Sequence, residues 1–203
     1  METSARLARC TCMLRVCILL ALTTSATAGV RVEQTSRDAA DGGLEYQVTI
    51  ADDTSHAALP ELALGVYGTT ATVGFESQLH LAPGDAWLFR EQKIAHGVGG
   101  AYLYRRVKGA VFVASAKPRV DLTVKTLFGK LAGARRPADE MGIVEFVEWT
   151  RDRKAMVVAL RGRDVSRFDV VDWRCTVDLA TGRAHVTAAQ ARANRGTFHR
   201  SSR

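Results

Sequence analysis

The feature that most constrains the fold is a series of short runs in which apolar residues recur at every second position. In the clearest run, 44–50, Leu44, Tyr46, Val48 and Ile50 alternate with polar residues. This two-residue period is typical of a β-strand with one buried and one wet face. The next four residues, 52–55, are Asp, Asp, Thr and Ser, whose side chains favour a turn.

Further runs rich in β-branched and aromatic residues follow at intervals typical of antiparallel sheets. They predict strands at 62–67, 70–75, 78–81, 87–90, 102–107, 110–114, 120–128, 143–149, 156–160 and 168–179. Within the 120–128 run, Val120, Leu122 and Val124 share one face of the expected strand. The expected turns lie at 82–85, 150–154 and 161–164, and a last hairpin at 179–183 leads into His185 and Val186.

These patterns predict a mainly β protein, a single antiparallel β-sandwich or partly open barrel with one or two short helices. Residues 29–43 form a polar lead-in in which Val30 and Val32 indicate at most a short edge strand. The single β-rich domain spans 44–187. Residues 129–142 are expected to form a loop with a short helix, and 188–203 a frayed helix or a basic, flexible tail.

The first 28 residues have the order of a cleavable signal peptide. Arg6, Arg9 and Arg15 precede the apolar run 16–22, and Ala26 and Ala28 stand at positions −3 and −1 of a cut before Gly29. The run is shorter than the roughly 20 residues that span a bilayer. The alternative, a buried amphipathic helix, would not place its arginines ahead of the run. We therefore expect an exported protein, periplasmic or secreted, and Met13 offers a second start site.

The charge of the chain limits which binding partners are expected, and its cysteine content limits which disulfides can form. The chain has 28 basic and 21 acidic residues, and removal of the leader with its three arginines and Glu2 leaves 25 and 20. This modest basic excess favours anionic envelope polymers or lipid head groups, and nucleic acid is not expected after export. The partners we expect are an envelope protein, a glycan or an anionic polymer. No apolar run beyond the leader is long enough to span a membrane, so the mature protein is expected to be soluble. Cys175 is its single cysteine, which excludes an intramolecular disulfide.

Motifs for catalysis and metal binding are weak. The chain contains neither Gly-x-Ser-x-Gly nor His-Glu-x-x-His. A Cys175–His185 nucleophile pair is conceivable, but alternation places Cys175 on an apolar strand face as a core residue. A metal cluster of His80, Asp85 and His96 is the alternative to solvated turn residues.

The acidic pairs do not indicate a carboxylate site. Glu145 and Glu148 would point to opposite faces of a strand. Asp139 and Glu140 are better explained as acids at the start of a helix. We therefore predict no catalytic residue, no metal and no cofactor.

The surface we single out as a binding face combines Tyr102, Tyr104 and Arg106, which a strand places on one side, with Trp87 as a further member. Aromatic rings with a cation suit sugars or acidic groups. The alternative is an ordinary cross-strand aromatic ladder. A second, weaker hypothesis is that the C-terminal arginines bind polyanions: Arg192, Arg195, Arg200 and Arg203.

Two functional classes follow. The first is an exported, non-catalytic binding or envelope-associated protein. The second is an exported hydrolase whose catalytic residues are dispersed in the sequence.

Overall fold

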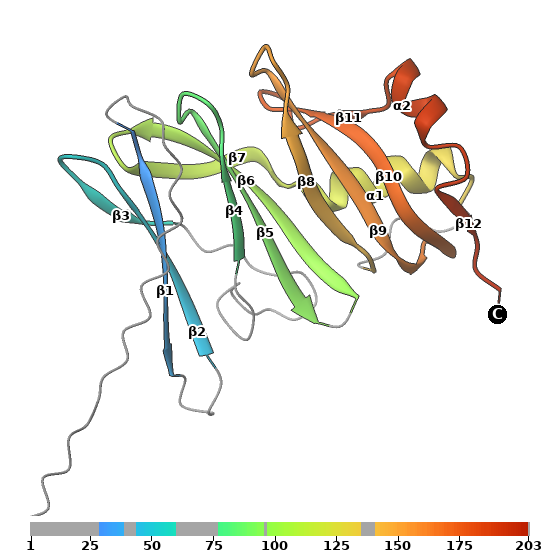
Figure 1. Ribbon diagram of the computed structural model, residues 1–203, viewed down its shortest axis with the longest axis horizontal. Coiled ribbons are helices and arrows are strands. Elements are labelled where there is room, and N and C mark those ends of the chain that lie inside the picture. Colours follow the sequence, from blue (N-terminus) through green and yellow to red (C-terminus); the bar gives the residue numbers. More distant parts are fainter. Residues whose placement is uncertain (1–28, 39–43, 60–76, 96, 135–140, 203) are drawn as a thin grey trace, which may run out of the picture.

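The computed structural model describes residues 29–38, 44–59, 77–95, 97–134 and 141–202 (Figure 1). Its strands are β1 (Arg31–Asp38), β2 (Leu44–Ala51), β3 (His56–Ala58), β4 (Ser77–Leu81), β5 (Trp87–Ala95), β6 (Val98–Lys108), β7 (Val111–Arg119), β8 (Ile143–Trp149), β9 (Ala155–Val165), β10 (Phe168–Asp178), β11 (Ala184–His185) and β12 (Phe198–Arg200). Its helices are α1 (Val120–Leu131) and α2 (Ala188–Ala193).

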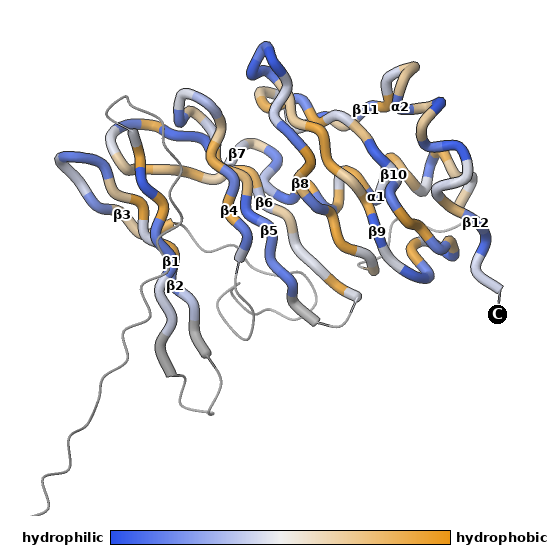
Figure 2. Tube along the Cα trace, viewed as in Figure 1, coloured by the Kyte–Doolittle hydropathy of each residue, from blue (hydrophilic) through white to orange (hydrophobic). Residues whose placement is uncertain are grey.

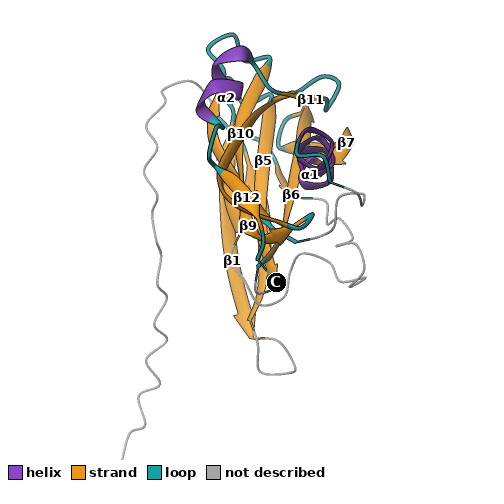
Figure 3. Ribbon diagram, turned by 90° about the vertical axis from the view of Figure 1, so that its right-hand side faces the viewer, coloured by secondary structure: helices purple, strands orange, loops and turns teal. Residues whose placement is uncertain are grey.

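The strands form three antiparallel sheets. The N-terminal sheet has the order β1-β2-β3, the middle sheet β4-β5-β6-β7, and the C-terminal sheet β11-β10-β9-β8 with β12 paired to β10. Seen from the side, α1 and α2 lie on opposite sides of the strands (Figure 3). The predicted mainly β class with antiparallel sheets and two short helices is confirmed, and the described strands do not close into a barrel.

The middle sheet carries buried side chains on both faces and therefore separates two cores. One face contributes Leu88, Tyr102 and Tyr104 to an N-terminal core shared with Val30, Val48, Ile50, Leu59, Ala110 and Phe112. The other contributes Phe89, Ala101 and Leu103 to a C-terminal core shared with α1 and the inward residues of β8, β9 and β10. Figure 2 shows hydrophobic segments along β8, β9 and β10. Alternation along each strand produces this division, because neighbouring side chains point to opposite faces.

The lead-in predicted at 29–43 contains a full strand. β1 has eight residues and pairs with β2 from Arg31–Ala51 to Asp38–Leu44. Among the described residues of this segment, Val30 and Val32 supply apolar side chains to the N-terminal core, and so small a number leaves the strand pattern faint in the sequence. The strand forms because its backbone groups pair with β2, whose predicted bounds are confirmed.

The strand predicted at 120–128 is wrong, since this segment is helix α1. Val120, Val124 and Phe128, spaced by four residues, lie buried in the C-terminal core, whereas Leu122 is 37% exposed. Asp121 in the first turn and Lys130 in the last suit the helix dipole. The helix ends where Gly133 adopts φ +70° and the Ala134 N–H donates to the Gly129 carbonyl, a Schellman ending.

The charged turn predicted at 161–164 is also wrong. β9 continues to Val165, and the two-residue turn comprises Ser166 and Arg167, both with positive φ. Such a turn matches the twist of the two strands it joins. Extending β9 places Arg161 and Arg163 on a strand.

The tail predicted at 188–203 is folded onto β10. Helix α2 starts with a capping box formed by Thr187 and Gln190. The Phe198 ring packs edge-on against Phe128 and Phe168, and β12 pairs with the start of β10. One anchoring aromatic residue thus orders a segment whose composition indicated disorder.

Turns at 52–55, 82–85, 150–154 and 179–183 are found where the sequence predicts them. The runs at 62–67 and 70–75, His96, and the Asp139–Glu140 pair lie outside the described residues. Neither helix in the described ranges is long and apolar enough to cross a membrane.

Candidate functional site

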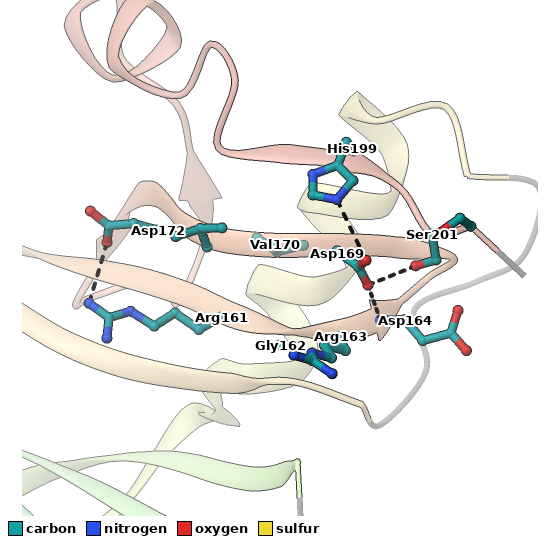
Figure 4. A pocket seen from close by; sticks show the side chains of 11 residues that line it. Arg161, Gly162, Arg163, Asp164, Asp169, Val170, Asp172, His199 and Ser201 are labelled. Carbon is teal, nitrogen blue, oxygen red and sulfur yellow. Dashed lines mark hydrogen bonds and ion pairs between the residues drawn. The ribbon is translucent and has the colours of Figure 1, made fainter.

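The described residues line an open groove on the C-terminal sheet. It has a volume of about 1000 Å³ and lies where β9, β10 and β12 meet (Figure 4). Its walls carry charged side chains of both signs and small polar ones. The lining residues are Arg161, Gly162, Arg163, Asp164, Asp169, Val170, Val171, Asp172, His199, Ser201 and Ser202.

Asp169 occupies one end of this groove and is held from three sides. Its Oδ1 accepts the backbone N–H of Asp164 at 3.1 Å and the Ser201 hydroxyl at 2.9 Å. Its Oδ2 lies 3.6 Å from His199 Nε2 (Figure 4). These interactions, the Asp164 N–H first, lower the pKa of Asp169. The carboxylate is therefore ionised and fixed in orientation at neutral pH.

The order of these groups does not match a hydrolytic triad. In a triad the histidine takes the proton of the serine hydroxyl, and the carboxylate orients the histidine from behind. Here Asp169 lies between the other two, and Ser201 donates to a carboxylate of lowered pKa, which is a weak base. The arrangement therefore fixes the groove wall and does not activate a nucleophile.

The other end of the groove alternates cations and carboxylates. The Arg161 guanidinium lies 3.1 Å from Glu145 and 4.0 Å from Asp172. Asp172 in turn accepts two hydrogen bonds from Arg174. The four side chains are between a third and about a half exposed, so each pair contributes little to stability. Oδ1 of Asp172 is itself buried. Val171, 63% exposed, adds an apolar contact surface.

The predicted binding face lies largely inside the protein. Tyr102, Tyr104 and Arg106 share one face of β6, as their spacing predicts, but both tyrosines have no exposed surface. They pack in the N-terminal core beneath β1 and β2. Their position is thus that of the alternative given by the sequence, aromatic residues that pack within the sheet and do not form a binding face.

Arg106 and Trp87 are separated by the sheet. Arg106 donates to the Gly109 carbonyl at 2.6 Å and lies 3.8 Å from both Asp52 and Asp85. Trp87 pairs across the strands with Arg105 and packs against the C-terminal core on the opposite face. The four residues predicted for the binding face do not form one exposed surface.

Cys175 is a core residue, as its alternation indicates. It is fully buried, and burial raises the pKa of its thiol to about 12. His185 pairs with Thr176 of β10. Because Thr176 and Cys175 are neighbours on one strand, their side chains point to opposite faces, and the His185 side chain lies on the face of Thr176. The Cys175–His185 nucleophile pair is therefore not formed.

The residues suggested as a metal cluster have other contacts. His80 Nε2 lies 3.0 Å from Glu91 Oε1, and its ring stacks on Phe146 at 4.3 Å. Asp85 accepts the backbone N–H of Val30 at 3.1 Å. Among the residues that the structure describes, no group of three or more His, Cys, Asp or Glu is arranged to hold a metal ion.

Glu145 and Glu148 lie on β8, where a bulge separates them in the pairing with β9. Glu145 pairs with Arg161, a residue that lines the groove. Of the four C-terminal arginines, Arg192, Arg195 and Arg200 are exposed on α2, the following turn and β12, and Arg203 lies outside the described residues.

The sequence did not reveal the groove, because the segments that form its walls were predicted to be a turn and a flexible tail. Arg161 and Arg163 were expected in a turn, and His199 and Ser201 in a flexible tail. The one signal that pointed to an ordered tail is Phe198, a large apolar residue in a polar segment. No protein-family model, no curated protein and no solved structure matches this chain.

Proposed function

We propose that the protein is an exported, non-catalytic binding protein whose groove on the C-terminal sheet takes a glycan. The observation that carries this proposal is the alternation of fixed carboxylates and cations along the groove, from Asp169 and His199 to Asp172 and Arg161. Carboxylates accept hydrogen bonds from hydroxyl groups, and arginine and histidine donate to them. Neighbouring sugar hydroxyls need both kinds of partner. The volume lies at the upper end of the range for ligand pockets, which suits several sugar units.

A glycan fits this lining better than a uniformly anionic polymer. A polyanion would approach Asp169 and Asp172 as closely as it approaches Arg161 and Arg163, and like charges repel. A polyhydroxylated ligand interacts favourably with both signs of charge. Exposed Val171 offers an apolar contact for the C–H face of a sugar ring.

Binding is favoured over hydrolysis by the state of the groove carboxylates. Hydrolysis needs an acid or base whose pKa is near the working pH. The Asp169 pKa is lowered, and its hydrogen bonds to Asp164 and Ser201 hold the side chain in the wall. This supports a positioning role.

Cleavage before Gly29 would be compatible with the contacts of the first described residues. Val30 is buried in the N-terminal core, and its N–H donates to Asp85. Cleavage before Gly29 would leave these contacts intact. Mass spectrometry of the chain isolated from its cells is expected to show Gly29 at the N-terminus; an N-terminus at Met1 or Met13 would refute export by this leader.

The binding proposal is tested on immobilised glycans. The panel contains neutral oligosaccharides, uronic acid-containing oligosaccharides and dextran sulfate as the polyanion. Arg163→Ala combined with His199→Ala removes two donors from the groove and is expected to weaken glycan binding at least about tenfold. The matched control, Arg183→Ala with His185→Ala, removes the same residue types near the other end of β10 and should bind like the wild type.

Two results would contradict the proposal. The first is equal glycan affinity of the groove variant and its control. The second is retention on dextran sulfate alone, which would identify a polyanion-binding protein. Release of shortened oligosaccharides by the wild type would instead favour the hydrolase.

A further inference from the structure

The hairpin between β6 and β7 exposes three valine side chains. Val107, Val111 and Val113 are 58%, 46% and 37% exposed, although all three lie in strands of the middle sheet. Single exposed apolar side chains are normal, but a contiguous group indicates contact with another body. The other face of the same hairpin is buried through Tyr104 and Phe112.

Strand pairing places these valines together on one face. Val113 pairs with Arg105, and Arg105 pairs with Trp87, so the three form a row across β7, β6 and β5. Val111, two residues before Val113, points to the same face as Val113. The valine face therefore combines Val107, Val111 and Val113 with the half-buried Trp87.

Cations border the valine face. Arg105 stands within the row, Lys108 is at the hairpin end, and Lys117 lies farther along β7; all three are exposed. The nearby carboxylates of Asp52 and Asp85 contact Arg106, which lies on the opposite face of β6. The valine face thus offers an apolar surface with a positive border.

The hairpin is held rigid, so the valine face is preformed. Arg106 Nε donates to the Gly109 carbonyl, and Ser55 Oγ accepts the Ala110 N–H at 3.1 Å. Gly109 has φ +55°, and a Cβ there would lie 2.9 Å from Ser55 Oγ. Residue 109 is therefore kept as glycine by its backbone angle and by the contact with the β2–β3 turn.

We infer that the β6–β7 hairpin docks on the surface of a membrane that contains anionic lipids. The valines enter the boundary between headgroups and acyl chains, and Arg105 and Lys108 remain at the level of the lipid phosphates. Trp87 is placed for the interface, where an amphipathic ring is favoured. Charge complementarity identifies the occupant, because the apolar residues of the valine face lie next to the exposed cations Arg105 and Lys108, an arrangement that suits anionic headgroups above acyl chains.

Vesicle co-sedimentation of the protein, in the form that its cells produce, tests the inference. The vesicles are pure phosphatidylcholine, or phosphatidylcholine and phosphatidylglycerol in equal parts, and they carry no glycan. The wild type is expected to sediment with the anionic vesicles and to be released by salt. Val107→Ser with Val111→Ser is expected to lower the partition coefficient at least about tenfold.

Two further variants control for folding and charge. Leu122→Ser with Leu131→Ser replaces two exposed apolar residues of α1, 37% and 57% exposed, outside the hairpin and the groove, and should sediment like the wild type. Arg105→Gln with Lys108→Gln should abolish the preference for phosphatidylglycerol. All variants must show the wild-type thermal transition, so that loss of binding is not loss of fold.

The inference is overturned if the wild type sediments with neither vesicle. It is also overturned if both serine variants behave alike, or if the glutamine variant keeps the preference for anionic lipid. Because the groove variants leave the hairpin unchanged, failure of the glycan test has no bearing on these outcomes.

Discussion

The two cores share the middle sheet but differ in what they bury. In the C-terminal core the aromatic rings of Phe128, Phe168 and Trp173 meet edge to face. Its buried charges lie on β5 and α1, at Glu91, Asp121 and Lys125. The N-terminal core adjoins Arg90, which is fully buried and shares a sheet face with Leu88 and Tyr102.

Arg90 is held by neighbouring polar side chains. Its Nε donates to Ser77 Oγ at 2.8 Å, and its Nη2 to Gln92 Oε1 at 3.2 Å. Ser77 also donates to Gln92, and its N–H donates to Gln34 Oε1 of β1. This network links the middle and N-terminal sheets. When an apolar side chain is shortened, the loss of stability grows with the volume removed. When one partner of a buried polar network is removed, the remaining donors or acceptors lose their hydrogen bonds, and this costs stability even if little volume changes.

The largest effect is expected in the C-terminal core. Phe128→Ala removes a ring whose centroid lies 5.2 to 5.9 Å from those of Phe198, Trp173 and Phe168. We expect the free energy of unfolding to fall by about 3–5 kcal/mol in urea denaturation, from lost burial and the cavity left behind. Leu122→Ala, on the exposed side of α1, should cost less than about 1 kcal/mol; equal losses would contradict the assigned helix face.

The next effect tests the polar network. Arg90→Met keeps the length of the side chain but removes the donors to Ser77 and Gln92. We expect a loss of about 2–3 kcal/mol, because buried acceptors are left without partners. If this variant is as stable as the wild type in urea denaturation, the hydrogen bonds of Arg90 do not stabilise the N-terminal core. That core would then tolerate the loss of a polar group as well as an apolar core tolerates a conservative substitution.

A third, smaller effect concerns the open edge of the C-terminal sheet. Between β11 and β12, Asn194 substitutes for a strand: its Oδ1 accepts the Arg174 N–H, and its Nδ2 donates to the Arg174 carbonyl, both at 2.8 Å. Asn194→Ala is expected to cost about 1–2 kcal/mol and to increase aggregation, because edge backbone groups become available. Arg195→Ala, the exposed neighbour, should change stability by less than about 0.5 kcal/mol; a larger loss there would show that α2 as a whole is responsible.

These regions also differ in how far the sequence predicts them. Alternation located β2, β4, β5, β8 and the core position of Cys175, because a two-residue period reports which face is buried. It failed at α1, where Val120 and Val124 fit both a strand and a helix. Phe128 at the next four-residue step and Gly133 as a helix end distinguish the two, but only when considered together.

The candidate sites were less predictable because they depend on contacts between distant segments. The groove needs β12 paired to β10, which brings His199 to Asp169 across 30 positions. The shared face of Tyr102 and Tyr104 was predictable, whereas its burial depends on the N-terminal sheet packing over it. Periodicity indicates which residues share a face but not what covers that face.

The smallest expected change in stability concerns Tyr102, a polar side chain of the N-terminal core. Tyr102 lies in the N-terminal core, where its buried hydroxyl has no hydrogen-bond partner among the described residues. The Arg119 guanidinium lies 5.6 Å from its ring centre. Burial raises the pKa of Tyr102 above its usual value. Tyr102→Phe keeps the ring and removes an unsatisfied group, so we expect it to stabilise the protein by up to about 1 kcal/mol.

The pH dependence of the same variant gives an independent measurement. A pKa raised on folding favours the native state below the unfolded value, and this contribution is lost as pH rises above about 10, where the unfolded tyrosine ionises. Urea denaturation from neutral to alkaline pH should therefore show a smaller decline for Tyr102→Phe than for the wild type. Cys175, whose pKa is raised to about 12, produces the corresponding decline in the C-terminal core and is unaffected by this substitution. If Tyr102→Phe instead lowers stability at neutral pH by more than about 1 kcal/mol, the Tyr102 hydroxyl has a hydrogen-bond partner. The N-terminal core would then satisfy the hydroxyl of Tyr102 as it satisfies the guanidinium of Arg90.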